Sequence, residues 1–326
     1  MKLGILGTGM IAKEVLQFVN QLEIESIYIL STQKSIEKAK ELAEKYNISK
    51  CFTDYNDMLA SDVEVLYIAL PNHLHYEFTK KALENGKHVI LEKPSTSNFA
   101  QLDELITLAK NNNVYLLEAV NLYHLPAYKA LKNDLDKIGK IKIVSLNYSQ
   151  YSSRYNAFKQ GNILPVFDYK KSGGALMDIN VYNIHASLGL FGEPKNAEYF
   201  PNIEKGIDTS GILIMNYNDF QAVCIGSKDC NAQAVCSIQG ELGTISFIGS
   251  PSTLTEYKIT LNNGIEQTYA IKKPEHRLIY EFREFIRIIN EKDDISYNNL
   301  LKNSISSAKI IESARKKAGI YFADEK

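Results

Sequence analysis

The sequence predicts an α/β protein in which an N-terminal doubly wound parallel sheet is followed by an α+β domain with a large, mostly antiparallel open sheet. Residues 1–120 alternate apolar runs with helical patterns at a regular pitch, which is typical of parallel strands with helices on both faces. From residue 121 onward, strand-like runs follow one another, separated by turn signals such as NYND and LNNG, which indicates antiparallel pairing. The predicted domains are therefore 1–120 and 121–326.

The N-terminal elements follow one another in regular order. Short apolar runs are expected to be strands, and segments with apolar residues three and four positions apart are expected to be helices. The run VEVLYIAL at 63–70 is nearly continuous, as in a strand that is covered on both faces. The expected strands are 2–7, 24–30, 63–70, 88–92 and 114–119. The expected helices are 10–22, 35–46, one through Ala82 with Gly86 as its C-cap, and one near 102–110.

The second part begins with a helix near 126–132. The segment IKIVSLNYSQY at 141–151 then alternates apolar and polar residues, which predicts a strand with one buried face. Several strand-like runs follow between residues 196 and 271, and two helices are expected near 278–290 and 300–318.

Composition excludes several classes of protein. The formal net charge of −1 provides no bulk positive field to attract nucleic acid or an anionic membrane. No apolar run approaches the roughly 20 residues needed to span a bilayer, and the glycine-rich start lacks a signal-peptide pattern. The four cysteines have neither the spacing nor the paired histidines of a metal site. We therefore expect a cytoplasmic protein with reduced core thiols and no bound metal.

The first strand leads into GTGMIA at 7–12, which has the spacing of a dinucleotide-binding turn. Gly7 permits the tight turn, Gly9 lets the backbone approach a pyrophosphate, and small Ala12 allows close packing of helix on strand. The start of the helix offers free N–H groups to the phosphates. A tight strand–helix turn without a ligand is the alternative, but the context favours a Rossmann dinucleotide site. The residues expected to contact the cofactor here are Gly7, Thr8, Gly9, Met10 and Ile11.

The end of the second strand bears on the choice of dinucleotide. An NAD site usually carries Asp or Glu there to bind the ribose hydroxyls. Here ILSTQKS supplies Ser31, Thr32 and Lys34 and no acid. Hydroxyls and a lysine suit a 2′-phosphate better, so NADP is expected in preference to NAD. The alternative is that these residues only cap the next helix, as Ser and Thr do well.

Two further stretches follow strands of the predicted parallel sheet. LPNHLH at 70–75 follows the long apolar strand, and the next strand ends in Glu92, Lys93 and Pro94. The carboxyl ends of parallel strands face the ligand crevice, and a residue before proline is held in extended geometry. An ordinary connecting turn would use Gly, Asn or Asp instead. The charged pair before a proline therefore indicates chemistry at this edge.

Taken together, five motifs resemble those of the glucose–fructose oxidoreductase, inositol dehydrogenase and rhizopine-catabolism family, often called Gfo/Idh/MocA. The resemblance implies that Lys93 is the catalytic lysine and also contacts the cofactor, that Glu92 contacts the nicotinamide ribose and that Pro94 fixes the turn. A structural salt bridge is the alternative role for Lys93, and the Lys93–Pro94 bond could be cis or trans. The motifs, in family order over nearly the whole chain, are GTGMIA (7–12), LPNHLH (70–75), EKP (92–94), EA (118–119) and GGALMDINVYNIH (173–185).

The same resemblance implies that the loop after the long apolar strand faces the cofactor. His73 or His75 could instead be surface histidines at the start of a helix. The residues that the resemblance assigns to the cofactor in this loop are Leu70, Pro71, Asn72 and His75.

The segment GGALMDINVYNIH predicts a glycine turn followed by a helix. Asp178, Tyr182 and His185 stand at i, i+4 and i+7, so one helical face presents a carboxylate, a phenol and an imidazole. A buried stripe with internal hydrogen bonds is the alternative. The resemblance implies that Asp178 and Tyr182 are catalytic, whereas Asn180 replaces the family's usual glycine and puts close approach of substrate there in doubt. Further candidates for substrate contact are His124, Arg154 and His185.

The resemblance thus implies an NAD(P)-dependent oxidoreductase that transfers hydride between the nicotinamide and a secondary alcohol or carbonyl of a sugar, polyol or related cyclic alcohol. Family members with a tyrosine at the position of Tyr182 resemble sugar oxidoreductases and dihydrodiol dehydrogenases more than inositol dehydrogenases. The alternative is a non-catalytic NAD(P)-binding sensor, although retention of Lys93, Asp178 and Tyr182 argues against it. By the same resemblance we expect a homodimer or homotetramer that associates through the C-terminal sheet.

Overall fold

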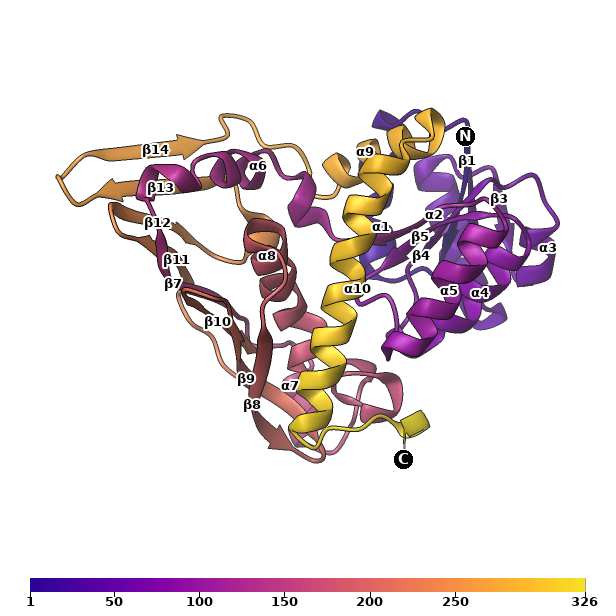
Figure 1. Ribbon diagram of the computed structural model, residues 1–326. Helices are drawn as coiled ribbons and strands as arrows, with labels where there is room; N and C mark the ends of the chain where they lie inside the picture. Colours follow the sequence, from indigo (N-terminus) through magenta and orange to yellow (C-terminus); the bar gives the residue numbers. More distant parts are fainter. Residues whose placement is uncertain (326) are drawn as a thin grey trace. The chain divides into compact units, whose positions relative to one another are not determined.

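The computed structural model describes residues 1–325 and divides them into two compact units (Figure 1). Unit 1 comprises residues 1–119 and 278–302, and unit 2 comprises residues 120–277 and 303–325. The predicted second domain, 121–326, differs from unit 2 because residues 278–302 belong to unit 1.

Unit 1 contains a six-stranded sheet in the order β3-β2-β1-β4-β5-β6, and every pair of neighbouring strands runs parallel. This is the doubly wound sheet that the sequence predicts, with the addition of the short β3 and α3. The strands are β1 (Lys2–Leu6), β2 (Ser26–Leu30), β3 (Lys50–Phe52), β4 (Val65–Ile68), β5 (His88–Glu92) and β6 (Leu116–Ala119). The helices between them are α1 (Met10–Leu16), α2 (Ile36–Tyr46), α3 (Tyr55–Leu59), α4 (His75–Glu84) and α5 (Phe99–Asn111).

The central strand β4 is completely buried. Val65, Leu66, Tyr67 and Ile68, which form β4, are each 0% exposed. A parallel strand with helices on both faces buries both of its rows of side chains, which explains why its sequence shows no alternation.

Helix α9 (Ile279–Glu291) completes the core of unit 1 although it follows β6 at a great distance along the chain. Its apolar residues recur at helical spacing, and Ile279, Phe282, Phe285 and Ile288 are all buried. The ring of Phe282 packs edge-on against Phe18 and Tyr67, with centroids 5.8 and 5.1 Å apart. The return of the chain to this core is the physical reason why the two-domain prediction differs from the structure.

Unit 2 contains an eight-stranded sheet in the order β14-β13-β12-β11-β7-β10-β9-β8. Its paired strands run antiparallel except for β7 and β10, which confirms the predicted mostly antiparallel sheet. The strands are β7 (Ile141–Ser149), β8 (Asn196–Glu204), β9 (Ile207–Asn216), β10 (Gln221–Ser227), β11 (Val235–Gly240), β12 (Gly243–Ile248), β13 (Glu256–Leu261) and β14 (Glu266–Ala270). The helices are α6 (Pro126–Asn133), α7 (Tyr155–Lys159), a π-helical turn (Leu176–Asn180), α8 (Val181–Phe191) and α10 (Asp294–Lys317), of which residues 294–302 belong to unit 1.

The two faces of this sheet have different surroundings. Helix α8 packs against β7 and β10, and on that face Val144, Leu146 and Cys224 are fully buried. On the other face Ile143 is 49% exposed and Ile212 is 41% exposed. Side chains alternate along a strand, so one face forms the core of unit 2 and the other remains open.

All four cysteines are free thiols. Cys224 and Cys236 are buried, but Cys51 is only partly buried and Cys230 is exposed, so the prediction of core thiols is wrong for Cys230. Cys230 lies in the loop after β10, beyond the end of the alternating strand pattern. Within residues 1–325, no helix has the length and apolar character needed to cross a membrane.

Candidate active site

The strand order of unit 1 determines where a dinucleotide can bind. The connections leave β1 toward β2 and β4 toward β5, so the order reverses between the adjacent strands β1 and β4. A crevice forms outside the carboxyl ends of the strands at such a switch point. The loop after β1 holds GTGMIA, the loop after β4 holds LPNHLH, and β5 ends at Glu92.

The two loop glycines have different structural reasons. Gly7 has φ +109°, and a Cβ there would lie 2.9 Å from the carbonyl oxygen of Ala69, so only glycine fits this turn. Gly9 immediately precedes α1, and no heavy atom lies within 4 Å of the position its Cβ would take. Ala12 is 0% exposed against the sheet. The loop therefore leaves room beside Gly9 for a ligand to approach the backbone, as a dinucleotide pyrophosphate requires.

The end of β2 combines a helix cap with an unused hydroxyl. Thr32 and Ser35 form a capping box, with their hydroxyl oxygens 2.9 Å apart, so the capping interpretation holds for Thr32. Ser31 is 7% exposed and its Oγ is buried without a hydrogen-bond partner. Lys34 is exposed on the same short turn. A buried hydroxyl without a partner next to an exposed lysine fits a ligand phosphate at this position.

The EKP turn is tied to its neighbours on the sheet. The hydroxyl of Tyr67, on β4, donates to the carboxylate of Glu92. The Lys93–Pro94 peptide bond is cis, and the backbone N–H of Ser95 donates to Glu118 Oε1 at 2.9 Å. Glu118 belongs to the EA motif on β6, so this motif holds the turn that presents Lys93.

His75 lies inside unit 1 and contacts two loops. It is 0% exposed; its Nε2 is 2.8 Å from the Leu70 carbonyl oxygen and its Nδ1 is 2.9 Å from that of Pro94. Burial lowers the pKa of His75, because an imidazolium is poorly solvated there, and the charge of Lys93 lowers it further. The structure therefore contradicts the surface alternative for His75. It instead joins the loop after β4 to the EKP turn.

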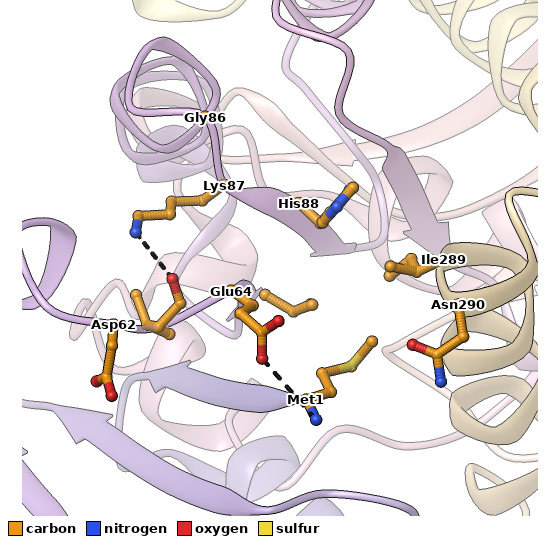
Figure 2. A pocket seen from close by; sticks show the side chains of 10 residues that line it. Met1, Asp62, Glu64, Gly86, Lys87, His88, Ile289 and Asn290 are labelled. Carbon is orange, nitrogen blue, oxygen red and sulfur yellow. Dashed lines mark hydrogen bonds and ion pairs between the residues drawn. The ribbon is translucent and has the colours of Figure 1, made fainter.

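Unit 1 also contains a pocket of about 550 Å³. Figure 2 shows the side chains that line it. Most of its lining residues lie just before β1, β4 and β5 or at the first residue of β4 and β5, among them Asp62, Glu64, Lys87 and His88. The others, Ile289 and Asn290, belong to α9. The former positions mark the amino ends of the strands, whereas a dinucleotide binds at the carboxyl ends. We therefore do not assign the cofactor to this pocket.

In unit 2, the predicted glycine turn and helix are present. Gly174 has φ +112°, and a Cβ there would lie 2.1 Å from Asp208 Oδ1. Asp208 Oδ2 accepts hydrogen bonds from the Leu176 N–H at 2.7 Å and from the Tyr199 hydroxyl at 2.8 Å. Burial raises the pKa of Asp208, and these hydrogen bonds oppose the rise. Asp208 thus fixes the start of the helix that carries Asp178.

The helix begins with the π-helical turn, and this changes the expected alignment of its side chains. Asp178 lies in the π-helical turn and Tyr182 lies in the first turn of α8, and both are partly exposed. The Tyr182 ring lies 5.8 Å from that of Tyr148 on β7. His185 is 1% exposed, and its Nδ1 lies 2.9 Å from the hydroxyl of Tyr123. The three residues therefore do not form one exposed face, since His185 points into the core of unit 2.

Asn180 is explained by its neighbour on the sheet. It is 1% exposed, donates from Nδ2 to the Cys224 carbonyl oxygen at 2.9 Å and accepts from Asn183 Nδ2 at 2.9 Å. On β10, a Cβ at Gly226 would lie 2.7 Å from Asn180 Cβ. The Asn180 side chain therefore points at the sheet, and the small residue required by this contact is Gly226.

The remaining candidates have different environments. Arg154 is exposed just before α7, and His124 is buried, at 5% exposure, in a short helix at 121–124. Sequence reasoning missed Asp208, Tyr148 and Lys228. Lys228 is buried and forms an ion pair with Asp178. No local pattern marks these residues, because their importance arises from contacts between distant segments.

Together, the switch-point loops of unit 1 and the carboxylate–phenol pair of unit 2 are features of a dinucleotide-binding oxidoreductase. The chain belongs to the Gfo/Idh/MocA family. Residues 1–120 match the model of the oxidoreductase family with the NAD-binding Rossmann fold, and residues 130–246 match that of the GFO/IDH/MocA C-terminal domain. These matches confirm the predicted family, fold class and NAD(P)-dependent oxidoreductase class.

Relatives and solved structures extend over the same range. The chain is 38% identical to the scyllo-inositol 2-dehydrogenase (NADP(+)) IolU of Bacillus subtilis (strain 168), over 99% of both chains. It is 27% identical to a trans-1,2-dihydrobenzene-1,2-diol dehydrogenase of Xenopus tropicalis, over 83% of this chain and 81% of the relative. The identity is thus higher to the inositol dehydrogenase than to the dihydrodiol dehydrogenase, the reverse of the order expected from Tyr182. The fold is similar to the 3-ketoreductase KijD10 of Actinomadura kijaniata in complex with NADP and TDP-benzene, with 21% identity, a TM-score of 0.83 and 97% of each chain covered.

Proposed function

We propose that the chain interconverts a secondary alcohol of a cyclic polyol or sugar and the corresponding ketone, with NADP as the preferred cofactor. The observation that carries this proposal is the Asp178–Tyr182 pair, whose carboxylate and phenol are partly exposed at the start of a helix that is otherwise largely buried. The scyllo-inositol dehydrogenase similarity over 99% of the chain supports the substrate class.

The proposed roles follow from the charge that each group carries. Oxidation of a secondary alcohol breaks a C–H bond, with loss of a hydride, and an O–H bond, with loss of a proton. A bound nicotinamide supplies the hydride acceptor. The ammonium of Lys93 stabilises the substrate oxygen as it gains negative charge, Tyr182 takes the proton, and Asp178 accepts a hydrogen bond from a substrate hydroxyl. His75 orients the EKP turn, and Ser31 and Lys34 bind the ribose phosphate.

The function is tested by screening polyols, aldoses and their ketones for a change in nicotinamide absorbance with NAD and with NADP. The proposal expects turnover with at least one cyclic polyol or sugar. Tight cofactor binding without turnover on the whole panel would instead support the alternative, a non-catalytic sensor.

The preference for NADP yields a separate prediction. NADPH should bind more tightly than NADH, because the end of β2 has no carboxylate to repel the 2′-phosphate. Thr32→Asp should reverse the preference, since it places a negative charge beside that phosphate. Lys34→Gln should weaken NADPH but not NADH, as measured by isothermal titration calorimetry.

A matched control is Lys38→Gln, which removes another exposed lysine farther along α2 and should change neither affinity. Tighter binding of NADH than of NADPH by tenfold, or about 1.4 kcal/mol, would contradict the assignment of the 2′-phosphate site.

We also propose that the open face of the unit 2 sheet is the surface through which two or four copies associate in the cytoplasm. Phe200, Ile212 and Ile225 are register neighbours across β8, β9 and β10, so they form one apolar row on that face. Phe200 is 55% exposed and Ile248, on the same face of β12, is 70% exposed. Exposed apolar patches of this kind are typical of protein interfaces, and the four free thiols are typical of a reducing compartment.

The oligomer is expected to dissociate when a charge enters this row. Ile212→Lys should reduce the mass measured by light scattering after size-exclusion chromatography, because an unpaired ammonium is costly in an apolar interface. Ile295→Lys is the control: Ile295 is 78% exposed but belongs to α10 in unit 1. A wild-type protein that is already monomeric at micromolar concentration would refute this assembly.

A further inference from the structure

Lys228 is a cation enclosed in unit 2. It directly follows β10, and its side chain is 2% exposed. Its backbone N–H donates to the Thr209 carbonyl oxygen at 2.8 Å, and its carbonyl oxygen accepts from the Ser152 N–H at 2.9 Å. Its Nζ lies 5.2 Å from the centroid of the Phe167 ring. A buried ammonium is costly unless it is paired, so its partners determine why a lysine stands here.

The direct partner of Lys228 is the carboxylate of Asp178. The ammonium donates to Asp178 Oδ2, and the two side chains differ in exposure, at 2% for Lys228 and 34% for Asp178. Asp208 also interacts electrostatically with Lys228, but its Oδ2 already accepts hydrogen bonds from the Leu176 N–H and the Tyr199 hydroxyl. The cation is therefore directed from the interior of unit 2 toward the carboxylate that lies at its surface.

The location of Asp178 makes this contact relevant to the reaction. Asp178 lies in the π-helical turn, Tyr182 follows in the first turn of α8, and β10 packs against the π-helical turn. Because Oδ2 is held by the buried ammonium, the rotation of the carboxylate is restricted. Loss of such positioning can lower the reaction rate by up to about 10²-fold.

We propose that Lys228 is a positioning residue, whose buried ammonium keeps the Asp178 carboxylate oriented beside Tyr182. This inference rests on the role proposed above for Asp178. Lys228 itself does not contact the reacting atoms; it acts through the ion pair.

The unequal burial of Lys228 and Asp178 predicts that replacing one or the other will affect stability differently. Asp178→Asn leaves a buried ammonium without its counter-charge, which is strongly destabilising. Lys228→Met replaces the ammonium with an apolar side chain of similar length, which a buried site tolerates well. Lys228→Met should therefore unfold at nearly the wild-type temperature and yet turn over slowly, whereas Asp178→Asn should be impaired in both respects.

The test is a double-mutant cycle with Lys228→Met, Asp178→Asn and the combined variant, in which kcat, KM and the unfolding midpoint are measured for each full-length protein. Lys228→Met is expected to lower kcat by about 10–10²-fold with KM nearly unchanged. In the Asp178→Asn background the same substitution should change kcat by less than about twofold and should raise the unfolding midpoint. Lys228→Gln serves as a second uncharged variant in case the methionine variant does not fold. Lys142→Gln is the control. It breaks the ion pair between Lys142 and Glu241, whose N–O distance is 2.7 Å, and both side chains are about half exposed, at 49% and 50%.

The outcomes separate the two levels of the proposal. Full multiplication of the two kcat losses in the combined variant overturns the positioning role, since Lys228 would then act independently of Asp178. If the wild-type protein is active and the Asp178→Asn variant has the same kcat, the role proposed for Asp178 is overturned. If no substrate is turned over by the wild-type protein, the proposed function and the positioning role both fail. An unfolding midpoint that stays low in the combined variant also overturns the proposal, because the ion pair then does not couple the residues.

Discussion

Replacing Lys93 with alanine is expected to lower kcat by roughly 10²–10⁴-fold, the range found for positioned polar and acid–base groups. The cofactor affinity should remain within a few-fold, because the loops that are proposed to hold the dinucleotide do not depend on this side chain. Glu92 is held by Tyr67, and the Ser95 N–H is held by Glu118, so the turn keeps its anchors when the lysine is shortened. Steady-state kinetics on the best substrate, together with calorimetric titration of NADPH, measure the two effects separately.

The matched control is Lys81→Ala on α4. Lys81 is 50% exposed and pairs only at the surface with Glu77, at 3.4 Å, so kcat should stay near the wild-type value. A Lys93→Ala protein that keeps more than half of its activity would show that the lysine is structural. The EKP stretch would then be an ordinary turn.

The second large effect is expected from Tyr182→Phe, which should lose at least about 10² in kcat. The substitution keeps the ring, and with it the contact with Tyr148 at 5.8 Å, but removes the hydroxyl that is proposed to take the proton. The transfer of a proton to Tyr182 requires its ionised form, and a phenol normally titrates near pH 10. The pH profile of kcat for the wild-type enzyme should contain an ionisation that is absent from the Tyr182→Phe variant.

His185→Asn is the comparison that gives this prediction its meaning. His185 is 1% exposed and lies against the Tyr123 hydroxyl, so its replacement should lower the unfolding midpoint and leave most of kcat. An inactive His185 variant beside an active Tyr182→Phe variant would move the proton-transfer role to the histidine. Equal losses in both would indicate a relay that single substitutions cannot divide between them.

Much of unit 1 could be predicted because its signals are local. Gly7 marks a turn whose positive φ favours glycine, and Gly9 leaves open space at the start of α1. Strand β4 is apolar throughout because both of its faces are covered. The carboxyl ends of parallel strands share one edge, so the positions of LPNHLH and EKP in the chain were enough to place both loops at that edge. The confirmed fold class rests on these local features.

The rest of the candidate site could not be predicted because it depends on contacts between distant segments. The periodicity of apolar residues predicts that a side chain is buried but not which residue it contacts. The packing of Asn180 on Gly226 could therefore not be predicted. The same limit applies to His75, whose two carbonyl partners come from separate loops. Lys228 is the extreme case: its sequence neighbourhood resembles the polar end of any strand, and only the fold brings it to Asp178.

The placement of α9 in unit 1 has a consequence for how the chain acquires its structure during synthesis. Phe282 packs on Phe18 and Tyr67, yet residues 120–277 must be translated between β6 and α9. At about 5–20 residues per second, that interval lasts roughly ten to thirty seconds. During this time the nascent parallel sheet exposes the apolar surface that α9 will cover, and ribosome-bound chains at this stage need protection from aggregation. The N-terminal unit is thus the first to emerge but cannot be completed until most of the chain has been translated.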